Sequence, residues 1–336
     1  MRISRLVAVF GVALTAFAVT APGNAEAERS TPVPIYAPAG AAADPGVTTV
    51  GDRAYAFLTG TLAPIASGST DGTGWAADGH ALSRLGAWSA GGAVWAPDAV
   101  RTGAGWVLYY AAPAKDMGGQ RCIGTAVATS VTGPYEPSDS PLICPQNGGE
   151  DPVAGRPVAA AGVIDPSPFQ DSDGSRYLLY KTQQSPATIR MFPLSADGLH
   201  GRGELSQELV RHSDSIENPV MVRHHGRYYL FASANWYDQC RYSTVWRSSS
   251  DLWSFADQAE HTLLDQSGTG LCGPGGADIV PAAHRIVFHA WVCSADNTPC
   301  DGTGVVTDPN KRRVLYGGIL EWRSGIPVVV AFLAPA

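Results

Sequence analysis

The sequence has little positive charge, no long apolar segment beyond its N-terminus and few signs of helix. Lys and Arg number 23 of 336 residues against 30 Asp and Glu, which gives a formal net charge of −7. Since no compact basic cluster offsets this charge, we do not expect a nucleic-acid or phosphate-binding surface. No run after the N-terminal region approaches the roughly 20 apolar residues of a membrane helix. Apolar residues show almost no sustained period of 3.6, so helices should be scarce.

Residues 1–27 have the layout of a secretory signal peptide. Arg2 and Arg5 supply a positive start, residues 6–19 are an apolar run, and small residues at positions 25 and 27 suit cleavage. An uncleaved N-terminal anchor is the alternative interpretation. We expect residues 28–336 to be one domain, because no linker or composition shift divides them. We also expect them to be secreted, and to act outside the cell as a monomer that binds neither membrane nor nucleic acid.

The chain has six cysteines but no Cys-x-x-Cys pair, which is the usual signature of a structural zinc site. An even number of cysteines in an exported chain favours disulfide bonds, although six cysteines allow 15 pairings. A nearest-neighbour set would let each bond bracket one loop. This interpretation predicts three bonds, which join Cys122 to Cys144, Cys240 to Cys272, and Cys293 to Cys300.

A recurring unit organises most of the chain. Five times, a group of turn residues precedes a short strand whose first residue is Tyr55, Trp106, Tyr177, Tyr228 or Ile286. These five anchors are 51, 71, 51 and 58 residues apart, and many of the 38 Gly and 25 Pro interrupt the apolar runs. A repeat of this length built from short strands is typical of propeller blades. The sequence therefore predicts an all-β fold, a five-bladed β-propeller in a single domain.

Three of the five units carry a carboxylate at nearly the same place. Asp44, Asp165 and Glu217 lie 11 or 12 residues ahead of their anchors, whereas Asp98 lies only eight ahead and is interpreted as structural or peripheral. The innermost strands of a propeller converge on a central axis, so the residues that open them meet at one mouth of the channel. Turn capping could explain each carboxylate singly, but three of them in register favour a site.

Three carboxylates at one mouth suit hydrolysis of a glycosidic bond. An inverting enzyme uses one carboxylic acid to protonate the leaving oxygen and one carboxylate to activate water, with the two groups about 6.5 to 9.5 Å apart. A third carboxylate nearby helps to keep the acid protonated near neutral pH. Trp95, Phe169 and Trp236 are candidates for flat apolar contacts with sugar rings, and packing in the core or between blades is the alternative.

Several motifs resemble the blade motifs of the family 43 glycoside hydrolases. The likeness covers nearly the whole chain after the leader, in the expected order. The matching stretches are WAPD at 95–98, CIGTAVATS at 122–130 with GPY at 133–135, VIDPSPFQDSDG at 163–174, IENP at 216–219 with YYLF at 228–231, GPGG at 273–276, and RVLY at 313–316 before Trp322.

The resemblance implies a five-bladed propeller that hydrolyses, with inversion, arabinofuranosides or xylosides of plant cell-wall polysaccharides and oligosaccharides. By position in the motifs, Asp44 matches the general base and Glu217 the general acid. Asp165 matches the carboxylate that tunes the pKa and orients the substrate. Arg313 lies where the family often has a substrate-contacting arginine. His289 matches a histidine that faces a central metal ion, usually calcium, and a satisfied core histidine is the alternative. No cofactor is expected to be required.

Departures from the family pattern bear on specificity. The chain has KTQQ at 181–184 where arabinanases commonly have Gly-Ser-Phe-Trp, and Gly-Ala at 276–277 where a histidine is common. These differences favour an exo-acting α-L-arabinofuranosidase over an endo-arabinanase and leave a β-xylosidase open. The related β-fructosidases are set aside because Ala43 and Asn218 stand beside the carboxylates where that group has Asn and Cys. A carbohydrate-binding propeller without turnover is the remaining alternative.

Overall fold

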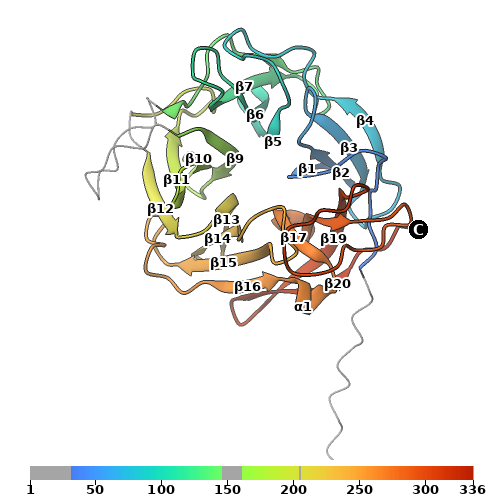
Figure 1. Ribbon diagram of the computed structural model, residues 1–336. Helices are drawn as coiled ribbons and strands as arrows, with labels where there is room; N and C mark the ends of the chain where they lie inside the picture. Colours follow the sequence, from blue (N-terminus) through green and yellow to red (C-terminus); the bar gives the residue numbers. More distant parts are fainter. Residues whose placement is uncertain (1–31, 146–160, 204–205, 336) are drawn as a thin grey trace, which may run out of the picture.

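Five four-stranded antiparallel sheets form a ring around a central axis in the computed structural model (Figure 1). The structure describes residues 32–145, 161–203 and 206–335, so the predicted signal peptide at residues 1–27 lies outside it. Each sheet is built from four strands that are consecutive in sequence, and the first strand of each lies innermost. The prediction of an all-β, single-domain, five-bladed propeller is confirmed.

The strands are short and their order repeats from blade to blade. Blade 1 contains β1 (Gly46–Val50), β2 (Arg53–Phe57), β3 (Pro64–Ser69) and β4 (Ala76–His80). Blade 2 contains β5 (Trp95–Thr102), β6 (Gly105–Pro113), β7 (Arg121–Ala128) and β8 (Glu136–Pro137). Blade 3 contains β9 (Val163–Gln170), β10 (Arg176–Thr182), β11 (Ala187–Leu194) and β12 (Gln207–His212).

The last two blades follow the same plan. Blade 4 contains β13 (Ile216–His224), β14 (Arg227–Ala234), β15 (Ser243–Ser249) and β16 (His261–Leu264). Blade 5 contains β17 (Cys272–Val280), β18 (Arg285–Val292), β19 (Arg312–Arg323) and β20 (Ile326–Phe332). Helix is scarce in the described ranges, where the structure has the single turn α1 (Gln266–Thr269) and a 3₁₀ turn at Pro281–Ala283, in agreement with the sequence prediction.

The predicted anchors Tyr55, Trp106, Tyr177, Tyr228 and Ile286 all lie on the second strand of their blade. The turn residues ahead of each anchor open the first strand, which pairs with the anchor strand through an antiparallel hairpin. The repeat in the sequence is therefore a repeat of the inner hairpin of each blade. Its opening residues come together at the axis.

The apolar core fills the five gaps between neighbouring blades. One cluster joins Phe57 of blade 1 to Leu108 of blade 2, and another joins Leu179 of blade 3 to Leu230 of blade 4. Comparable clusters lie between blades 2 and 3, 4 and 5, and 5 and 1. Because successive residues of a strand point to opposite faces, each blade buries both faces against its neighbours. This packing fixes the inner strands, and with them the channel wall.

The ring closes where the last blade meets the segment before β1. The backbone N–H of Ile35 donates to the carbonyl of Leu315 at 2.8 Å, and the N–H of Ala42 donates to the carbonyl of Arg313 at 2.8 Å. Residues 35–42 therefore run along β19, the third strand of blade 5. This closure carries Asp44 to the channel beside blade 5.

All six cysteines are paired as predicted. The structure contains the bonds Cys122–Cys144, Cys240–Cys272 and Cys293–Cys300. Among the residues that the structure describes, we find no helix with the length and apolar character needed to cross a membrane.

Candidate active site at one mouth of the channel

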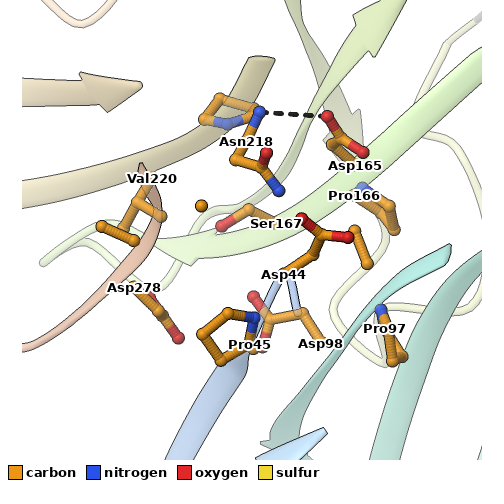
Figure 2. Close-up of a pocket in the computed structure, with 15 residues that line it drawn as sticks. Asp44, Pro45, Pro97, Asp98, Asp165, Pro166, Ser167, Asn218, Val220 and Asp278 are labelled. Atoms are coloured by element: carbon orange, nitrogen blue, oxygen red, sulfur yellow. Dashed lines mark hydrogen bonds between the residues drawn. The ribbon is translucent and has the colours of Figure 1, made fainter. Parts of the chain in front are cut away.

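Each innermost strand places one three-residue segment on the channel wall, and the first residue of every segment has a positive φ between 41° and 55°. Asp and Asn adopt this left-handed conformation more readily than most residues, and three of the five positions hold them. Figure 2 shows residues of these segments surrounding the channel. The segments are Asp44-Pro45-Gly46, Ala96-Pro97-Asp98, Asp165-Pro166-Ser167, Asn218-Pro219-Val220 and Gly276-Ala277-Asp278.

This structural register differs slightly from the sequence register. Asp44 and Asp165 are equivalent, but the residue equivalent to them in blade 4 is Asn218, so Glu217 precedes the shared position by one residue. In blade 5 the shared position is held by Gly276, the last residue of the GPGG stretch. Asp98 is third in its segment and also lines the cavity at the opposite mouth, which agrees with its interpretation as peripheral to the site.

A pocket of about 790 Å³, partly open to solvent, lies at the mouth where the inner strands begin. It gathers six of the residues predicted to form a site: the three carboxylates, two tryptophans and the arginine. The complete lining consists of Asp44, Thr59, Trp95, Ile164, Asp165, Lys181, Gln183, Glu217, Asn218, Trp236, Tyr237 and Arg313. The structure therefore brings together residues that are up to 269 positions apart in the sequence.

Asp44 is held as an anion. Nη1 of Arg313 donates to Oδ1 at 3.0 Å, and the hydroxyl of Thr59 donates to Oδ2 at 2.7 Å. Burial opposes the negative charge, but Arg313, the imidazole of His289 and the Thr59 hydroxyl outweigh burial and lower the pKa of Asp44. Thr59 is itself fixed, because its oxygen accepts the N–H of Ala96 at 2.9 Å. Asp44 is thus a rigid carboxylate with proton-accepting capacity.

Both carboxylate oxygens of Glu217 are occupied by donors. Nζ of Lys181 lies 2.5 Å from Oε2, and the hydroxyl of Tyr242 donates to Oε1 at 2.9 Å. The Tyr242 hydroxyl also lies 3.0 Å from Oδ1 of Asn218. Burial, with the neighbouring carboxylates, raises the pKa of Tyr242 well above its usual value, so the phenol keeps its proton. These contacts hold the Glu217 side chain, only 11% exposed, in one orientation.

Asp165 has a different electrostatic environment. Burial raises its pKa to about 7, with a further contribution from the charge of Glu217, and Lys181 opposes the rise only in part. Its Oδ2 accepts the backbone N–H of Asn218 at 3.0 Å, which connects blade 3 to blade 4 beside Glu217. One pocket therefore holds an anionic carboxylate at Asp44 and a carboxyl at Asp165 that keeps a proton up to neutral pH.

Aromatic side chains form part of the pocket wall and its rim. The guanidinium of Arg121 lies over the ring of Trp95, 3.4 Å from its centroid, which fixes the indole. Trp236 and Tyr237 are 48% and 47% exposed at the rim. The backbone of this rim is supported from below, because the indole N–H of Trp291 donates to the carbonyl of Tyr237 at 2.7 Å. Exposed aromatic faces of this kind suit contacts with the apolar faces of sugars.

Phe169 does not belong to this pocket, so the prediction that it binds substrate there is corrected. It lies near the far end of β9, is 8% exposed, and packs in the gap between blades 3 and 4. Its ring stacks on Tyr177 at 6.3 Å between centroids. Phe169 follows Asp165 by only four residues in the sequence. Four residues of extended strand carry it about 13 Å along the channel wall.

Sequence reasoning missed Lys181, Tyr242, Thr59 and Tyr237. Lys181 was noticed only as a departure from a family pattern, and Thr59 lies in a loop without a motif. Tyr242 reaches Glu217 from the strand-opening region of β15, far from any of the recurring turns. The only available signal for Lys181 was a lysine at a position that pattern and strand length predict to be buried.

His289 is fully buried and contacts Asp44. Its Nδ1 accepts the backbone N–H of Asp44 at 3.0 Å, and burial, together with the charge of Arg313, lowers the pKa of the ring to about 3. The neutral ring therefore carries its hydrogen on Nε2, which is buried without a hydrogen-bond partner among the described residues. An N–H cannot ligate a cation directly, so direct coordination of calcium by His289 does not fit this arrangement.

The arrangement of the other potential metal-binding side chains in the described residues also provides no evident site for direct coordination of a metal ion. Within the described ranges, no group of three or more His, Cys, Asp or Glu side chains is arranged to hold a metal ion. A calcium ion in the channel stays a prediction, as does the expectation that no cofactor is required.

The fold and the pocket define a class of protein. A propeller with buried carboxylates and exposed aromatic faces at one mouth has the groups that acid–base cleavage of glycosides requires. The profile of Glycosyl hydrolases family 43 matches residues 34–307. The chain belongs to glycoside hydrolase family 43.

Solved structures share this architecture at low sequence identity. A thermostable family-43 glycoside hydrolase superposes with a TM-score of 0.68 at 20% identity, over 90% of this chain and 97% of that one. An exo-1,5-α-L-arabinanase from a bovine ruminal metagenomic library superposes with a TM-score of 0.63 at 18% identity, over 86% of this chain and 96% of that one.

A similar sequence is the xylosidase/arabinosidase 43A of Humicola insolens. It is 34% identical over 87 residues, which are 26% of this chain. The match spans only 21% of that relative's length.

Proposed function

We propose that the protein is a secreted, monomeric, inverting and exo-acting α-L-arabinofuranosidase that releases arabinofuranosyl groups from arabinan or arabinoxylan. The observation that carries the proposal is the contrast between carboxyl groups in one pocket. Arg313 and Thr59 keep Asp44 ionised, while burial keeps a proton on Asp165 up to about pH 7 beside Glu217. An inverting glycosidase needs this combination of a permanent base and an available proton at neutral or weakly acidic pH.

The proposed reaction uses each carboxyl group once. Asp44 accepts a proton from water, whose oxygen attacks the anomeric carbon. The bond from that carbon to the leaving oxygen breaks, and Glu217 gives its proton to the leaving oxygen. Asp165 faces the sugar as the group that orients substrate and maintains the protonation of the acid. The net change adds one water across the glycosidic bond, and a return of one proton from Asp44 to Glu217 through solvent resets the pocket.

Arg313 has a second role in the proposal. It holds Asp44 through Nη1, and its side chain, 14% exposed, also lines the pocket. Guanidinium N–H groups on the wall of a pocket suit sugar hydroxyls as acceptors. Trp95 and Trp236 would supply flat contacts on either side of the ring. The departures from the arabinanase pattern at residues 181–184 and 276–277 favour exo action.

β-Xylosidase activity is the second candidate. The matched relative from Humicola insolens is named as both a xylosidase and an arabinosidase, and an arabinofuranosyl and a xylopyranosyl group are both five-carbon sugars of similar size. The groups in the pocket could act on either of them. A propeller that binds carbohydrate without turnover is the third outcome to be tested.

A panel of aryl glycosides tests the proposal directly. We expect release of the aryl group from 4-nitrophenyl α-L-arabinofuranoside, and much less from the β-D-xyloside and β-D-galactoside. Branched and debranched arabinan would then distinguish exo from endo action by the size of the first products. Preferred cleavage of the β-D-xyloside would favour the second candidate. Binding of arabino-oligosaccharides without cleavage of any substrate would support the third.

A further inference from the structure

Lys181 lies at the floor of the pocket, on the second strand of blade 3. It belongs to β10, where the pairing with β9 shifts register between Leu179 and Lys181, opposite the segment that carries Asp165. Its side chain is only 9% exposed, yet it contributes to the pocket lining. The largely buried ammonium side chain therefore forms part of the pocket wall.

Every polar contact of the ammonium is on the side of Glu217. Nζ lies 2.5 Å from Oε2 of Glu217 and 3.3 Å from the hydroxyl of Ser215. Burial of an ammonium without partners is unfavourable by several kcal/mol, so the carboxylates must hold it there. Burial would lower the pKa of Lys181, but Glu217 and Asp165 outweigh it and raise the pKa above the ordinary value. Lys181 is thus a fixed positive charge paired with Glu217 and close enough to Asp165 to act on it electrostatically.

The other charged groups around these carboxyls are already committed. Arg313 pairs with Asp44, and the guanidinium of Arg121 lies over Trp95 while its Nη1 donates to the carbonyl of Ala93 at 2.9 Å. The imidazole of His289 and the phenol of Tyr242 are neutral near pH 7, because burial lowers the pKa of His289 to about 3 and raises that of Tyr242 well above its usual value. Among the described residues, Lys181 is consequently the full positive charge in direct contact with Glu217, and its charge also acts on Asp165.

We propose that Lys181 is a positioning residue that limits the Asp165–Glu217 pair to a single shared proton. Burial disfavours negative charge on both carboxyl groups, and without a cation beside them no fixed positive charge would offset it. The ammonium stabilises one negative charge in the pair and so displaces one of the two protons. The catalytic role of the shared proton rests on the proposed function. The number of protons on the pair is a property of the folded protein and does not depend on that function.

A single proton is the number that the proposed reaction requires. When Glu217 holds it, the acid is ready to protonate the leaving oxygen, and Asp165 is an anion that can stabilise positive charge developing on the sugar. When Asp165 holds it, Glu217 forms the ion pair that the structure shows. With two protons in the pair, the acid would be ready but the stabilising anion would be lost.

The proton count can be measured without any enzymatic activity. We would follow the side-chain carboxyl signals of ¹³C-labelled Asp and Glu by NMR as a function of pH, and assign the pair with Asp165→Asn and Glu217→Gln. We expect both titration midpoints of the pair to rise by about one unit or more in Lys181→Met. In the charge-preserving control Lys181→Arg they should stay near the wild-type values. Unchanged midpoints in Lys181→Met would overturn the inference.

Kinetics provide the second readout. If the aryl arabinofuranoside is a substrate, the basic limb of kcat/KM against pH should move upward in Lys181→Met by the same shift, and stay in place in Lys181→Arg. A loss of activity with an unmoved limb would mean that Lys181 has only a packing role, and would refute the inference. Should Lys181→Met fail to fold, as judged by circular dichroism, Lys181→Gln removes the charge with a polar replacement. If wild type cleaves nothing, the proposed function fails while the NMR midpoints still decide on Lys181.

Discussion

Nη1 of Arg313 donates a hydrogen bond to Oδ1 of Asp44 at 3.0 Å, although the two residues are 269 positions apart in the sequence. Asp44 precedes the first strand of blade 1, and Arg313 lies on β19 of blade 5. The same junction places Nδ1 of His289 3.0 Å from the backbone nitrogen of Asp44. Closure of the ring therefore assembles the environment of the proposed base. Disturbance of this junction should affect catalysis and not only stability.

Replacing Arg313 with Met should move the acidic limb of kcat/KM to higher pH. Arg313 is the main charge that offsets burial and keeps the pKa of Asp44 low, so its loss raises that pKa and leaves the base protonated in a wider acidic range. We expect a shift of about one unit and a fall in kcat/KM of about 10- to 100-fold. The control is Arg312→Met, because Arg312 contacts the carbonyl of Ser294 instead. An unmoved acidic limb in Arg313→Met would contradict this account of Asp44.

Replacing Glu217 with Gln should remove activity in proportion to the leaving group's need for a proton. General acids contribute about 10²- to 10⁴-fold, so we expect a loss in that range with alkyl or sugar leaving groups. The loss should be small with 2,4-dinitrophenyl as leaving group. The amide keeps an acceptor for the Tyr242 hydroxyl, so the melting curve should show a folded protein. Equal losses with both leaving groups would remove Glu217 from the role of acid.

The stereochemistry of the product tests Asp44 and the mechanism together. An NMR time course of the first product should show inversion at the anomeric carbon, because the base activates water and forms no covalent intermediate. Asp44→Asn should be as damaging as Glu217→Gln, and added azide should yield no stable product of retained configuration. Retention in the wild-type product would exclude the inverting mechanism.

We expect the carboxyl groups of Asp98 and Asp278 to make the protein less stable as pH rises. Asp278 is buried in the channel and Asp98 is half-buried there. Burial, with repulsion from Asp278, raises the pKa of Asp98 well above its usual value, and burial raises that of Asp278 to about 7. The folded state then binds protons more tightly than the unfolded chain between about pH 4 and pH 7. In this window the free energy of unfolding falls as pH rises. The stability lost in this way is not regained above about pH 7.

Asp98→Asn isolates this effect. It removes one charge of the pair, so the variant should gain stability relative to wild type as pH rises from about 5 to 8, by about 1 to 3 kcal/mol. Melting temperatures of both proteins across that range provide the measurement. Asp71→Asn is a suitable control, since Asp71 is an exposed turn residue. A difference between Asp98→Asn and wild type that does not change with pH would mean that the two carboxyls do not share the raised pKa.

The sequence allowed the fold and the main carboxylates to be predicted because both depend on local signals that recur. The first residue of each turn, such as Asp165, adopts the same positive-φ conformation in every blade, and a ring must bring such turns together. The disulfides were predictable for a related reason, since nearest neighbours such as Cys122 and Cys144 lie within one blade and its loop. Repetition therefore supplied three-dimensional information without any knowledge of long-range contacts.

The remainder of the site depends on contacts between residues that have no recurring motif in the sequence. Lys181 and Tyr242 reach Glu217 from a neighbouring strand and a loop, and nothing in their local sequence indicates the direction in which they point. Phe169 shows the opposite error, since nearness in sequence to Asp165 suggested nearness in space. A strand, however, extends away from its first residue by about 3.3 Å per position. Charge environment, and hence the protonation states on which mechanism depends, was the least predictable part.

Trp236 should contribute to binding and not to the chemical step. It is 48% exposed at the rim of the pocket and no hydrogen bond joins it to the three carboxylates in the described residues, so the fold should tolerate its replacement. We expect Trp236→Ala to raise KM for arabino-oligosaccharides by about tenfold, the equivalent of about 1.4 kcal/mol, and to leave kcat nearly unchanged. A control with similar exposure is Val50→Ala. Val50 is 46% exposed and is the last residue of β1, at the end of the strand away from the pocket. A fall in kcat with unchanged KM would mean that Trp236 helps to position the reacting groups. Equal kinetics in wild type and Trp236→Ala would mean that this tryptophan does not contact the substrate.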